Sequence, residues 1–226
     1  MTFILICHNR HFLFNNGSGL ILVDTGSPAS LHKDGTMVIA GQSFSVPTTH
    51  MNVGTEYISE KVGREIVGLL GMDIISRFQM AIHKVGAEGG TIEFNSNADD
   101  IPNCRHIDTF NVMGIPGIGI TVDGQTVRLL FDTGAPISYI GNSLTDGKTC
   151  IGHATDFSPL TGVDSYEVDL YSLRSEFCGK AFDVSYANMP FELSLTLSMI
   201  RVDGIIGYDL LDQFKVILNG GEVWIG

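Results

Sequence analysis

The triplet Asp-Thr-Gly occurs twice in this chain, at Asp24–Gly26 and at Asp132–Gly134. Each copy follows a run of apolar residues, which is typical of a buried strand. Two carboxylates in matched halves of one chain can be brought face to face by pseudo-two-fold symmetry. Like charges held that close cannot both ionise easily, so the pair shares a proton and can act as acid and base. The triplets therefore predict an acid–base site formed by Asp24 and Asp132.

The other two residues of each triplet have physical roles of their own. The hydroxyls of Thr25 and Thr133 can both donate and accept, so two facing threonines can lock the two loops together. The glycines that follow them allow a close approach of backbone and place an N–H beside each carboxylate. Downstream of each triplet, a Gly-apolar-apolar-Gly segment is expected to pack under the loop as a buried brace (Gly68–Gly71 and Gly204–Gly207).

The triplets belong to an internal repeat that covers most of the chain. A hairpin turn signal precedes each triplet, Asn16-Gly17 in the first half and Asp123-Gly124 in the second. Short runs of β-branched and aromatic residues between Gly, Pro and Asn predict an all-β protein. Helix is expected only for a turn or two after each brace. We predict an N-terminal lobe over residues 1–97 and a C-terminal lobe over 98–226.

The repeat is broken by an insertion in the second half. Gly41 follows Gly26 by 15 positions, whereas the matching Gly179 follows Gly134 by 45. About 30 extra residues with a turn-like centre predict a long hairpin, and long excursions from compact domains are usually functional. The alternative is a surface hairpin without a role. The centre of the insertion, which we expect to be a substrate-binding flap, is Phe157, Ser158, Pro159, Leu160, Thr161 and Gly162.

Composition excludes several classes of partner. The chain has 226 residues, a net charge of −12 and 17% charged residues, so it lacks the basic surface that nucleic acids or anionic membranes require. No apolar run approaches the roughly 18 residues that span a bilayer, and no export signal is recognisable, so a cytoplasmic location is expected. The four cysteines are expected to be free thiols, with a Cys150–Cys178 bridge left open as an alternative.

A metal site is not indicated by the sequence. The chain has seven histidines and four cysteines but no Cys-x-x-Cys or His-Glu-x-x-His spacing. His8 and His11, if they share a strand, would face opposite sides. The histidines are expected on the surface or in hydrogen-bonded core positions, and no cofactor is expected.

The triplets and their braces resemble those of the aspartic peptidases, the retropepsin and pepsin group. Val23–Ser27 and Phe131–Ala135 resemble the active-site loops of that family, in which Ser27 and Ala135 complete the loop support. Leu69–Gly71 and Ile205–Gly207 resemble its hydrophobic-hydrophobic-Gly segments. The resemblance covers nearly the whole chain, and each half resembles one retropepsin subunit. It implies two β-barrel-like lobes with a cleft between them, and a water held by Asp24 and Asp132. It also implies peptide-bond hydrolysis without a metal or a covalent intermediate.

The resulting hypothesis is an aspartic endopeptidase that acts on peptides or proteins and is active as a monomer. The chain departs from the family in having both halves fused at retropepsin size, with a flap only in the second half. The alternative is a catalytically inactive peptide-binding protein of the same fold. Ser27 is expected to donate to Asp24, and Ala135 cannot do so for Asp132, so Asp132 is predicted to be the more readily protonated aspartate.

Overall fold

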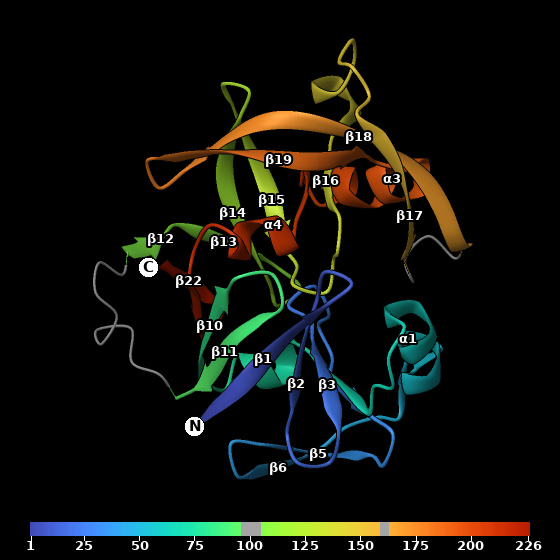
Figure 1. Cartoon of the computed structure of the whole chain (residues 1–226), viewed down its shortest axis with the longest axis vertical. Coiled ribbons are helices and arrows are strands. Elements are labelled where there is room, and N and C mark those ends of the chain that lie inside the picture. Colours follow the sequence, from blue (N-terminus) through green and yellow to red (C-terminus); the bar gives the residue numbers. More distant parts are fainter. Residues whose placement is uncertain (96–104, 159–162) are drawn as a thin grey trace.

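The computed structural model describes residues 1–95, 105–158 and 163–226, and the side chains of residues 158, 163 and 164 are outside the description. The chain is mostly β and forms two sheet-rich lobes, as predicted (Figure 1). The strands of the first half are β1 (Thr2–His8), β2 (His11–Asn15), β3 (Leu20–Val23), β4 (Leu31–His32), β5 (Thr36–Ile39), β6 (Gln42–Ser45), β7 (Thr49–His50), β8 (Val53–Gly54), β9 (Gly68–Leu70), β10 (Gln79–Val85) and β11 (Gly89–Phe94).

The second half follows the same order with longer strands around the insertion. Its strands are β12 (Arg105–Ile107), β13 (Thr109–Val112), β14 (Ile115–Val122), β15 (Gln125–Phe131), β16 (Ser138–Ile140), β17 (Gly152–Ser158), β18 (Val163–Phe177), β19 (Lys180–Asn188), β20 (Gly204–Ile206), β21 (Val216–Asn219) and β22 (Glu222–Ile225). The helices are α1 (Thr55–Val62), α2 (Met72–Ile75), α3 (Phe191–Met199) and α4 (Tyr208–Leu211), with a 3-10 turn at Asn142–Leu144.

One sheet joins the two halves of the chain. Among the described residues its strand order is β12-β22-β21-β10-β11-β1-β2-β3-β9-β4. The contact between the halves is the antiparallel pair β10–β21, in which Met80 faces Leu218 and both are fully or almost fully buried. The repeat predicts that the N-terminal strand and the last strand of each half share a sheet, and β1, β11 and β22 do so. The shared sheet leaves neither lobe with an unpaired edge at the junction.

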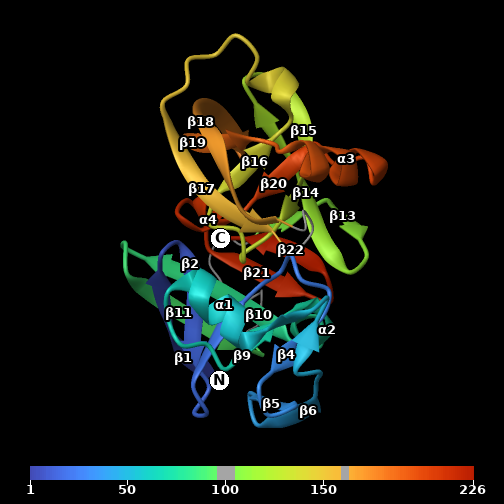
Figure 2. The same cartoon turned by 90° about the vertical axis from the view of Figure 1, so that its right-hand side faces the viewer.

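The second sheet carries the inserted hairpin. Its order is β13-β14-β15-β20-β16-β19-β18-β17, with a further pairing of β14 to β18. β17 and β18 pair antiparallel, and β18 continues into a long ladder with β19. The predicted long hairpin is thus present, and it projects from the second lobe toward α1 of the first (Figures 1 and 2). Its expected tip, Pro159–Gly162, lies outside the described residues.

Matched tight turns support the repeat. Ala40 and Gly41 connect β5 to β6 with φ of 49° and 80°, and Cys178 and Gly179 connect β18 to β19 with φ of 52° and 79°. Two successive residues with positive φ are the signature of the hairpin turn whose twist fits the flanking strands. Each lobe therefore has a hairpin at this position, and the strands of the hairpin are longer in the second lobe.

Helices α2 and α4 occur after the two braces, as predicted, whereas α1 and α3 were not expected. α1 buries Ile58 and Val62 against the first lobe and ends at Gly63, whose φ of 76° suits a left-handed cap. α3 buries Leu193 and Leu197, which lie one turn apart on one face. Figure 2 shows α1 on the first lobe and α3 on the second.

Cys7, Cys150 and Cys178 are free thiols, so the Cys150–Cys178 bridge is absent, and Cys104 lies outside the described residues. In the described parts of the chain, no helix combines the length and apolar character needed to cross a membrane.

Truncation at the junction should destabilise the whole protein. Leu218→Ala removes a buried side chain opposite Met80, and large-to-small changes of this kind cost about 2–5 kcal/mol. Leu195→Ala, at a half-exposed position of α3, is the matched control and should change stability by about 0.5 kcal/mol or less. Urea unfolding followed by Trp224 fluorescence measures both. Equal stability of the two variants would contradict the junction described above.

Candidate active site

The two aspartates occupy equivalent positions at the ends of paired strands. Asp24 follows β3, which runs parallel to β9, and its N–H donates to the Leu70 carbonyl at 3.0 Å. Asp132 follows β15, which runs parallel to β20, and its N–H donates to the Ile206 carbonyl at 3.0 Å. Each carboxyl is therefore fixed by a buried ladder, because the strand and its brace hold the backbone on both sides.

The glycine that ends each brace is required by close backbone approach. A Cβ on Gly71 would collide with the backbone of Ala29, and a Cβ on Gly207 would collide with the carbonyl of Ala135. The following N–H groups complete the contact: Met72 donates to Ser27 at 2.9 Å and Tyr208 to Ala135 at 3.3 Å. The braces pack beneath the loops, as the sequence predicts.

Four hydrogen bonds between the threonines and the backbone join the two loops. The N–H of Thr25 donates to Oγ1 of Thr133 at 3.0 Å, and the reciprocal bond measures 2.9 Å. Each hydroxyl then donates across the junction, from Thr25 to the Phe131 carbonyl at 2.7 Å and from Thr133 to the Val23 carbonyl at 2.8 Å. Both threonines are fully buried, so these bonds are sheltered from water.

A second symmetric pair of contacts was missed from the sequence. Ser30 donates its hydroxyl to Asp73 at 2.6 Å, and Ser138 donates to Asp209 at 2.7 Å. Asp73 and Asp209 lie in the first turns of α2 and α4. The signal was present, since each serine lies six positions after the aspartate of its triplet in both copies of the repeat.

Arg10 makes a further contact between the two halves of the chain. Its guanidinium donates to Asp209 at 2.7 Å and to the Pro136 carbonyl at 2.6 Å, and it stacks over the Tyr208 ring. This contact connects the turn before β2 to the second active-site loop.

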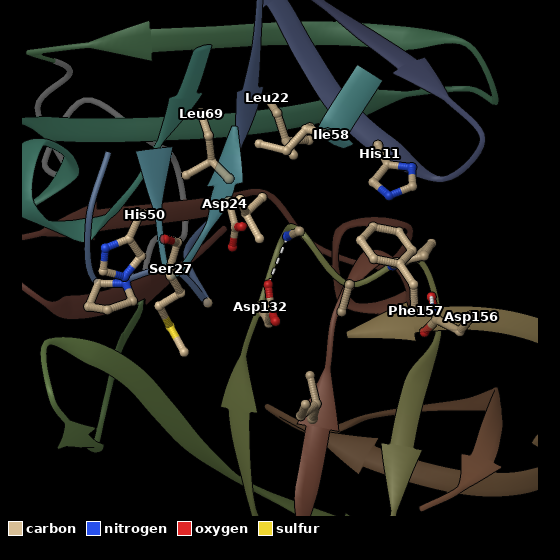
Figure 3. A pocket seen from close by; sticks show the side chains of 18 of the residues that line it. His11, Leu22, Asp24, Ser27, His50, Ile58, Leu69, Asp132, Asp156 and Phe157 are labelled. Atoms are coloured by element: carbon tan, nitrogen blue, oxygen red, sulfur yellow. Dashed lines mark hydrogen bonds between the residues drawn. The ribbon is translucent and has the colours of Figure 1, made fainter. Parts of the chain in front are cut away.

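The loops cross, so that each glycine lies against the opposite aspartate. A Cβ on Gly26 would collide with the Asp132 carboxyl, and a Cβ on Gly134 would collide with that of Asp24. The two carboxyls come from opposite lobes and lie next to each other between them (Figure 3). Within its own loop, Asp132 accepts the N–H of Gly134 at 2.8 Å. Only glycine permits this approach at both positions.

Burial raises the pKa of both aspartates, and it does so unequally. The pKa of Asp24 lies well above its usual range because of burial, the nearby charge of Asp132 and a hydrogen bond to Asp132. Burial raises the pKa of Asp132 as well, but backbone N–H groups of Gly134, Ala135 and Gly26 and the hydrogen bond from Asp24 oppose the shift. The pKa of both carboxyls is therefore raised, with the larger shift at Asp24.

The contact on which the predicted protonation of Asp132 rests, from the Ser27 hydroxyl to Asp24, is not formed. The hydroxyl of Ser27 donates to the Ala29 carbonyl at 2.8 Å, so it does not favour the ionised form of Asp24. The two carboxyls differ mainly through their own contact: the charge and hydrogen bond of Asp132 raise the pKa of Asp24, whereas the hydrogen bond from Asp24 lowers that of Asp132.

A cavity of about 210 Å³ opens beside the two aspartates. Its walls are mostly apolar, with polar groups at a few points only. The apolar lining includes Leu22, Leu31, Val53, Ile58, Leu69, Leu193 and Ile205, and the polar groups include His11, His50, Tyr139, Asp156 and Tyr166. Such a surface suits a ligand with apolar side chains and a few fixed hydrogen bonds.

Asp156 is a third buried carboxyl in this cavity. It accepts the Tyr139 hydroxyl at 2.6 Å and the N–H of Phe157 at 2.8 Å. Burial raises its pKa, and the nearby charge of Asp132 adds to the shift. The Tyr166 hydroxyl lies 3.4 Å from that of Tyr139, so the base of the hairpin is held by a small polar network.

The expected flap residues lie only partly within the described chain. Phe157 lines the cavity, and the backbone of Ser158 ends β17, while Pro159, Leu160, Thr161 and Gly162 lie outside the described residues. The Phe157 ring contacts Tyr57 of α1 at 6.0 Å between centroids, and the Lys61 ammonium lies over it at 5.9 Å. The hairpin therefore meets the first lobe at α1.

The first lobe also contributes to the cavity wall, which the sequence did not indicate. His50, Met51 and Val53, from the short β7–β8 pair, line it together with Ile58 of α1. The expectation that only the second half covers the site is therefore incomplete. The β7–β8 strands have two residues each, too few for a recognisable alternation.

Two expectations about histidine also need correction. His8 and His11 lie on different strands and face each other across the β1–β2 pair. His106 and His153 are exposed as expected, but His11 is buried and neither of its ring nitrogens has a hydrogen-bond partner in the described residues.

One cluster has the donor atoms of a metal site. The thiol of Cys150, Nδ1 of His153 and a carboxylate oxygen of Asp169 lie within 4.8 Å of one another. His153 and Asp169 already pair at 2.8 Å, and the Cys150 thiol donates to the Gly152 carbonyl. None of the three lines the cavity, so the cluster is separate from the aspartate pair.

Comparisons with solved structures identify the fold. The aspartic proteinase from Irpex lacteus superposes with a TM-score of 0.52 at 10% sequence identity, over 100% of this chain and 96% of that one. EIAV protease, solved with the inhibitor HBY-793, matches at a TM-score of 0.31 and 17% identity, over 46% of this chain and 92% of that one. No protein-family model and no curated protein matches the chain. The chain has the aspartic peptidase fold, as its triplets predicted.

Removing one threonine hydroxyl should weaken the junction of the loops. Thr25→Val leaves the Thr133 N–H and the Phe131 carbonyl without partners in a buried site, which costs about 1–3 kcal/mol for each unpaired group. Thr25→Ser retains the hydroxyl and serves as the control. Thermal unfolding compares the variants, and a Thr25→Val protein as stable as Thr25→Ser would contradict this role.

The raised pKa of Asp24 predicts a pH-dependent effect of Asp24→Asn. A carboxyl whose pKa is higher in the folded state supports folding at low pH and loses that support as the pH rises through its folded pKa. The amide that replaces the carboxyl does not titrate, so the stability of the variant relative to wild type should increase between pH 4 and pH 7. The increase is about 1.4 kcal/mol for each unit by which folding raises the pKa.

Urea unfolding at several pH values measures this difference. Asp146→Asn, at an exposed position, is the control and should show no such trend. A stability difference between Asp24→Asn and wild type that is the same at pH 4 and pH 7 would contradict the raised pKa.

Proposed function

We propose that this protein is an aspartic endopeptidase, with Asp24 and Asp132 as its catalytic residues. The observation that carries the proposal is the pair of half-buried carboxyls from crossed loops, in which Asp132 raises the pKa of Asp24 by charge and by a hydrogen bond. A fold likeness by itself would leave the function open, because folds host many activities. The site adds the acid–base chemistry that hydrolysis requires.

The unequal environments of the two carboxyls assign their roles. Asp132, the ionised member, is the general base for an attacking water, since backbone N–H groups favour its charged form. Asp24, the protonated member, donates to the carbonyl oxygen of the scissile peptide bond. The proton of the water passes to Asp132 as the water oxygen bonds to the carbonyl carbon, and a proton returned to the amide nitrogen lets the C–N bond break.

The surrounding loops keep the pair in this arrangement. Thr25, Gly26 and Ser27 support Asp24, and Thr133, Gly134 and Ala135 support Asp132, through the bonds and close approaches described above. Pre-organised groups of this kind need little rearrangement during the reaction. Phe157, at the end of β17, covers one side of the cavity. We propose that the hairpin acts as the flap and excludes water from the reaction.

The substrate class follows from the cavity and from the covalent link between the halves. Apolar side chains dominate its lining, so we propose peptide or protein substrates with apolar residues near the scissile bond. Both aspartates lie in one chain whose halves are joined by the β10–β21 pair, so we propose that the monomer contains a complete site. Dilution should therefore leave the specific activity unchanged.

Substitution of the proposed general base tests the function directly. Asp132→Asn should lower kcat/KM on a peptide library by about 10²–10⁴-fold, the usual contribution of acid–base catalysis. Its folding and its binding of a substrate peptide should persist. The exposed Asp146→Asn variant is the control for a carboxyl-to-amide change and should keep wild-type activity.

Two results would contradict the proposal. Wild-type protein that binds peptides between pH 3 and pH 7 without cleaving any would identify a binding protein instead. Cleavage that persists at the wild-type rate in Asp132→Asn would place the chemistry at other residues.

A further inference from the structure

A cluster on the second lobe, outside the reaction site, brings together three different metal-ligating groups. The thiol of Cys150, a ring nitrogen of His153 and a carboxylate oxygen of Asp169 all lie within 4.8 Å of one another. Cys150 and His153 are exposed and Asp169 is half-buried, so an ion can reach all three from solvent. Thiolate, imidazole and carboxylate are the ligands of Zn²⁺ in proteins, whereas Mg²⁺ and Ca²⁺ take oxygen ligands. The donor set therefore indicates Zn²⁺.

Strand pairing fixes the backbone on which these three side chains stand. His153 in β17 and Asp169 in β18 are directly opposite each other in the antiparallel ladder, so their side chains share one face of the sheet. The N–H of Ile151 donates to the Leu170 carbonyl at 2.8 Å, which holds the segment of Cys150 against the same strand. The three groups therefore start from fixed backbone positions, and only their side chains need to turn toward an ion.

The separations of the donor atoms are near those of a tetrahedral zinc site. Zinc lies about 2.3 Å from sulfur and about 2.0–2.2 Å from nitrogen or oxygen, so two ligands of one ion are roughly 3.3–3.6 Å apart. Nδ1 of His153 and Oδ1 of Asp169 are 2.8 Å apart, and the other separations do not exceed 4.8 Å. Side-chain rotations that move the donor atoms by about 1 Å produce the coordination geometry, with a water at the fourth position.

The contacts that the ion would replace are weak ones. The His153–Asp169 pair is exposed to solvent, and exposed ion pairs contribute little to stability. The Cys150 thiol donates to the Gly152 carbonyl, and it gives up that proton when it binds a metal as thiolate. The net charge of −12 of the chain further favours the approach of a cation.

The cluster lies at the base of the inserted hairpin and at the edge of its sheet. Among the described residues, β17 is the last strand in the order of the second sheet, so only one of its sides is paired. Such an edge is stabilised when it is covered or tied down. An ion bound by the segment before β17, by β17 itself and by β18 links all three.

We propose that Cys150, His153 and Asp169 form a Zn²⁺ site that crosslinks the base of the β17–β18 hairpin. The cluster is separate from Asp24 and Asp132, so this inference does not rest on the proposed peptidase function. The sequence does not reveal the site, because Asp169 lies 16 positions after His153 and meets it only through the pairing of the strands.

Calorimetric titration with ZnCl₂, with the thiols kept reduced, tests the site. Wild type should bind one Zn²⁺ per chain. Cys150→Ser and Asp169→Asn should each weaken binding by about 10–100-fold or more, since loss of a mere supporting group already costs that much. His106→Gln is the matched control, because His106 and Glu222 form an exposed pair at 3.8 Å that belongs to no cluster of three such groups in the described chain. Cys178→Ser controls for a thiol outside the cluster.

Cobalt and thermal unfolding report the ligands and the effect on the fold. Co²⁺ bound to wild type should give a near-ultraviolet charge-transfer band from the thiolate, and Cys150→Ser should lack it. The Tm of wild type should rise with the Zn²⁺ concentration, because a ligand that binds the folded state stabilises it. The Tm of Cys150→Ser should stay constant.

Three results would overturn the proposal. The first is equal zinc affinity in wild type, Cys150→Ser and Asp169→Asn. The second is a loss of binding in Cys178→Ser or His106→Gln as large as that in Cys150→Ser, which would place the ion elsewhere. The third is a cobalt complex without the thiolate band. His153→Gln, at an exposed position, replaces either cluster variant if that variant does not fold.

Discussion

The structure depends on holding two carboxyl groups against each other at the wall of a cavity between the lobes. Burial alone disfavours their charges, and two like charges at this separation repel. Burial and the charge of Asp132 raise the pKa of Asp24, and backbone N–H groups oppose the upward shift at both carboxyls. A difference in pKa between two neighbouring carboxyls is what allows one to act as an acid and the other as a base.

The rest of the fold follows from that constraint. Parallel ladders end at both aspartates, the braces fix the loops from beneath, and the threonines bond one loop to the other. The shared sheet keeps the lobes in register, since β10 and β21 pair across the junction. A small displacement of either lobe would separate the carboxyls. The shared sheet and the hydrogen bonds between the loops therefore both keep the two carboxyls in contact.

Much of this arrangement could be predicted from the sequence, because the active-site motifs occur once in each half of an internal repeat. The repeat identified the triplets, the braces, the hairpin turns and the position of the insertion. Elements present once, or too short for a pattern, were missed. The sequence of α3 alternates Leu with Ser and Thr, a pattern that predicts a strand. The segment is helical because Leu193 and Leu197, one turn apart, both pack into the core. The larger upward pKa shift of Asp24 depends on burial and on its contact with Asp132, which no residue type reveals.

The central claim is that Asp24 and Asp132 titrate as one pair with the proton on Asp24. A carbon-13 NMR titration of the aspartate carboxyls in the wild-type protein measures this most directly. The account predicts that the Asp24 carboxyl stays protonated well above the range of ordinary exposed carboxyls, and that the Asp132 resonance responds to the same step. Independent titration of Asp24 and Asp132 together with the exposed aspartates would contradict it.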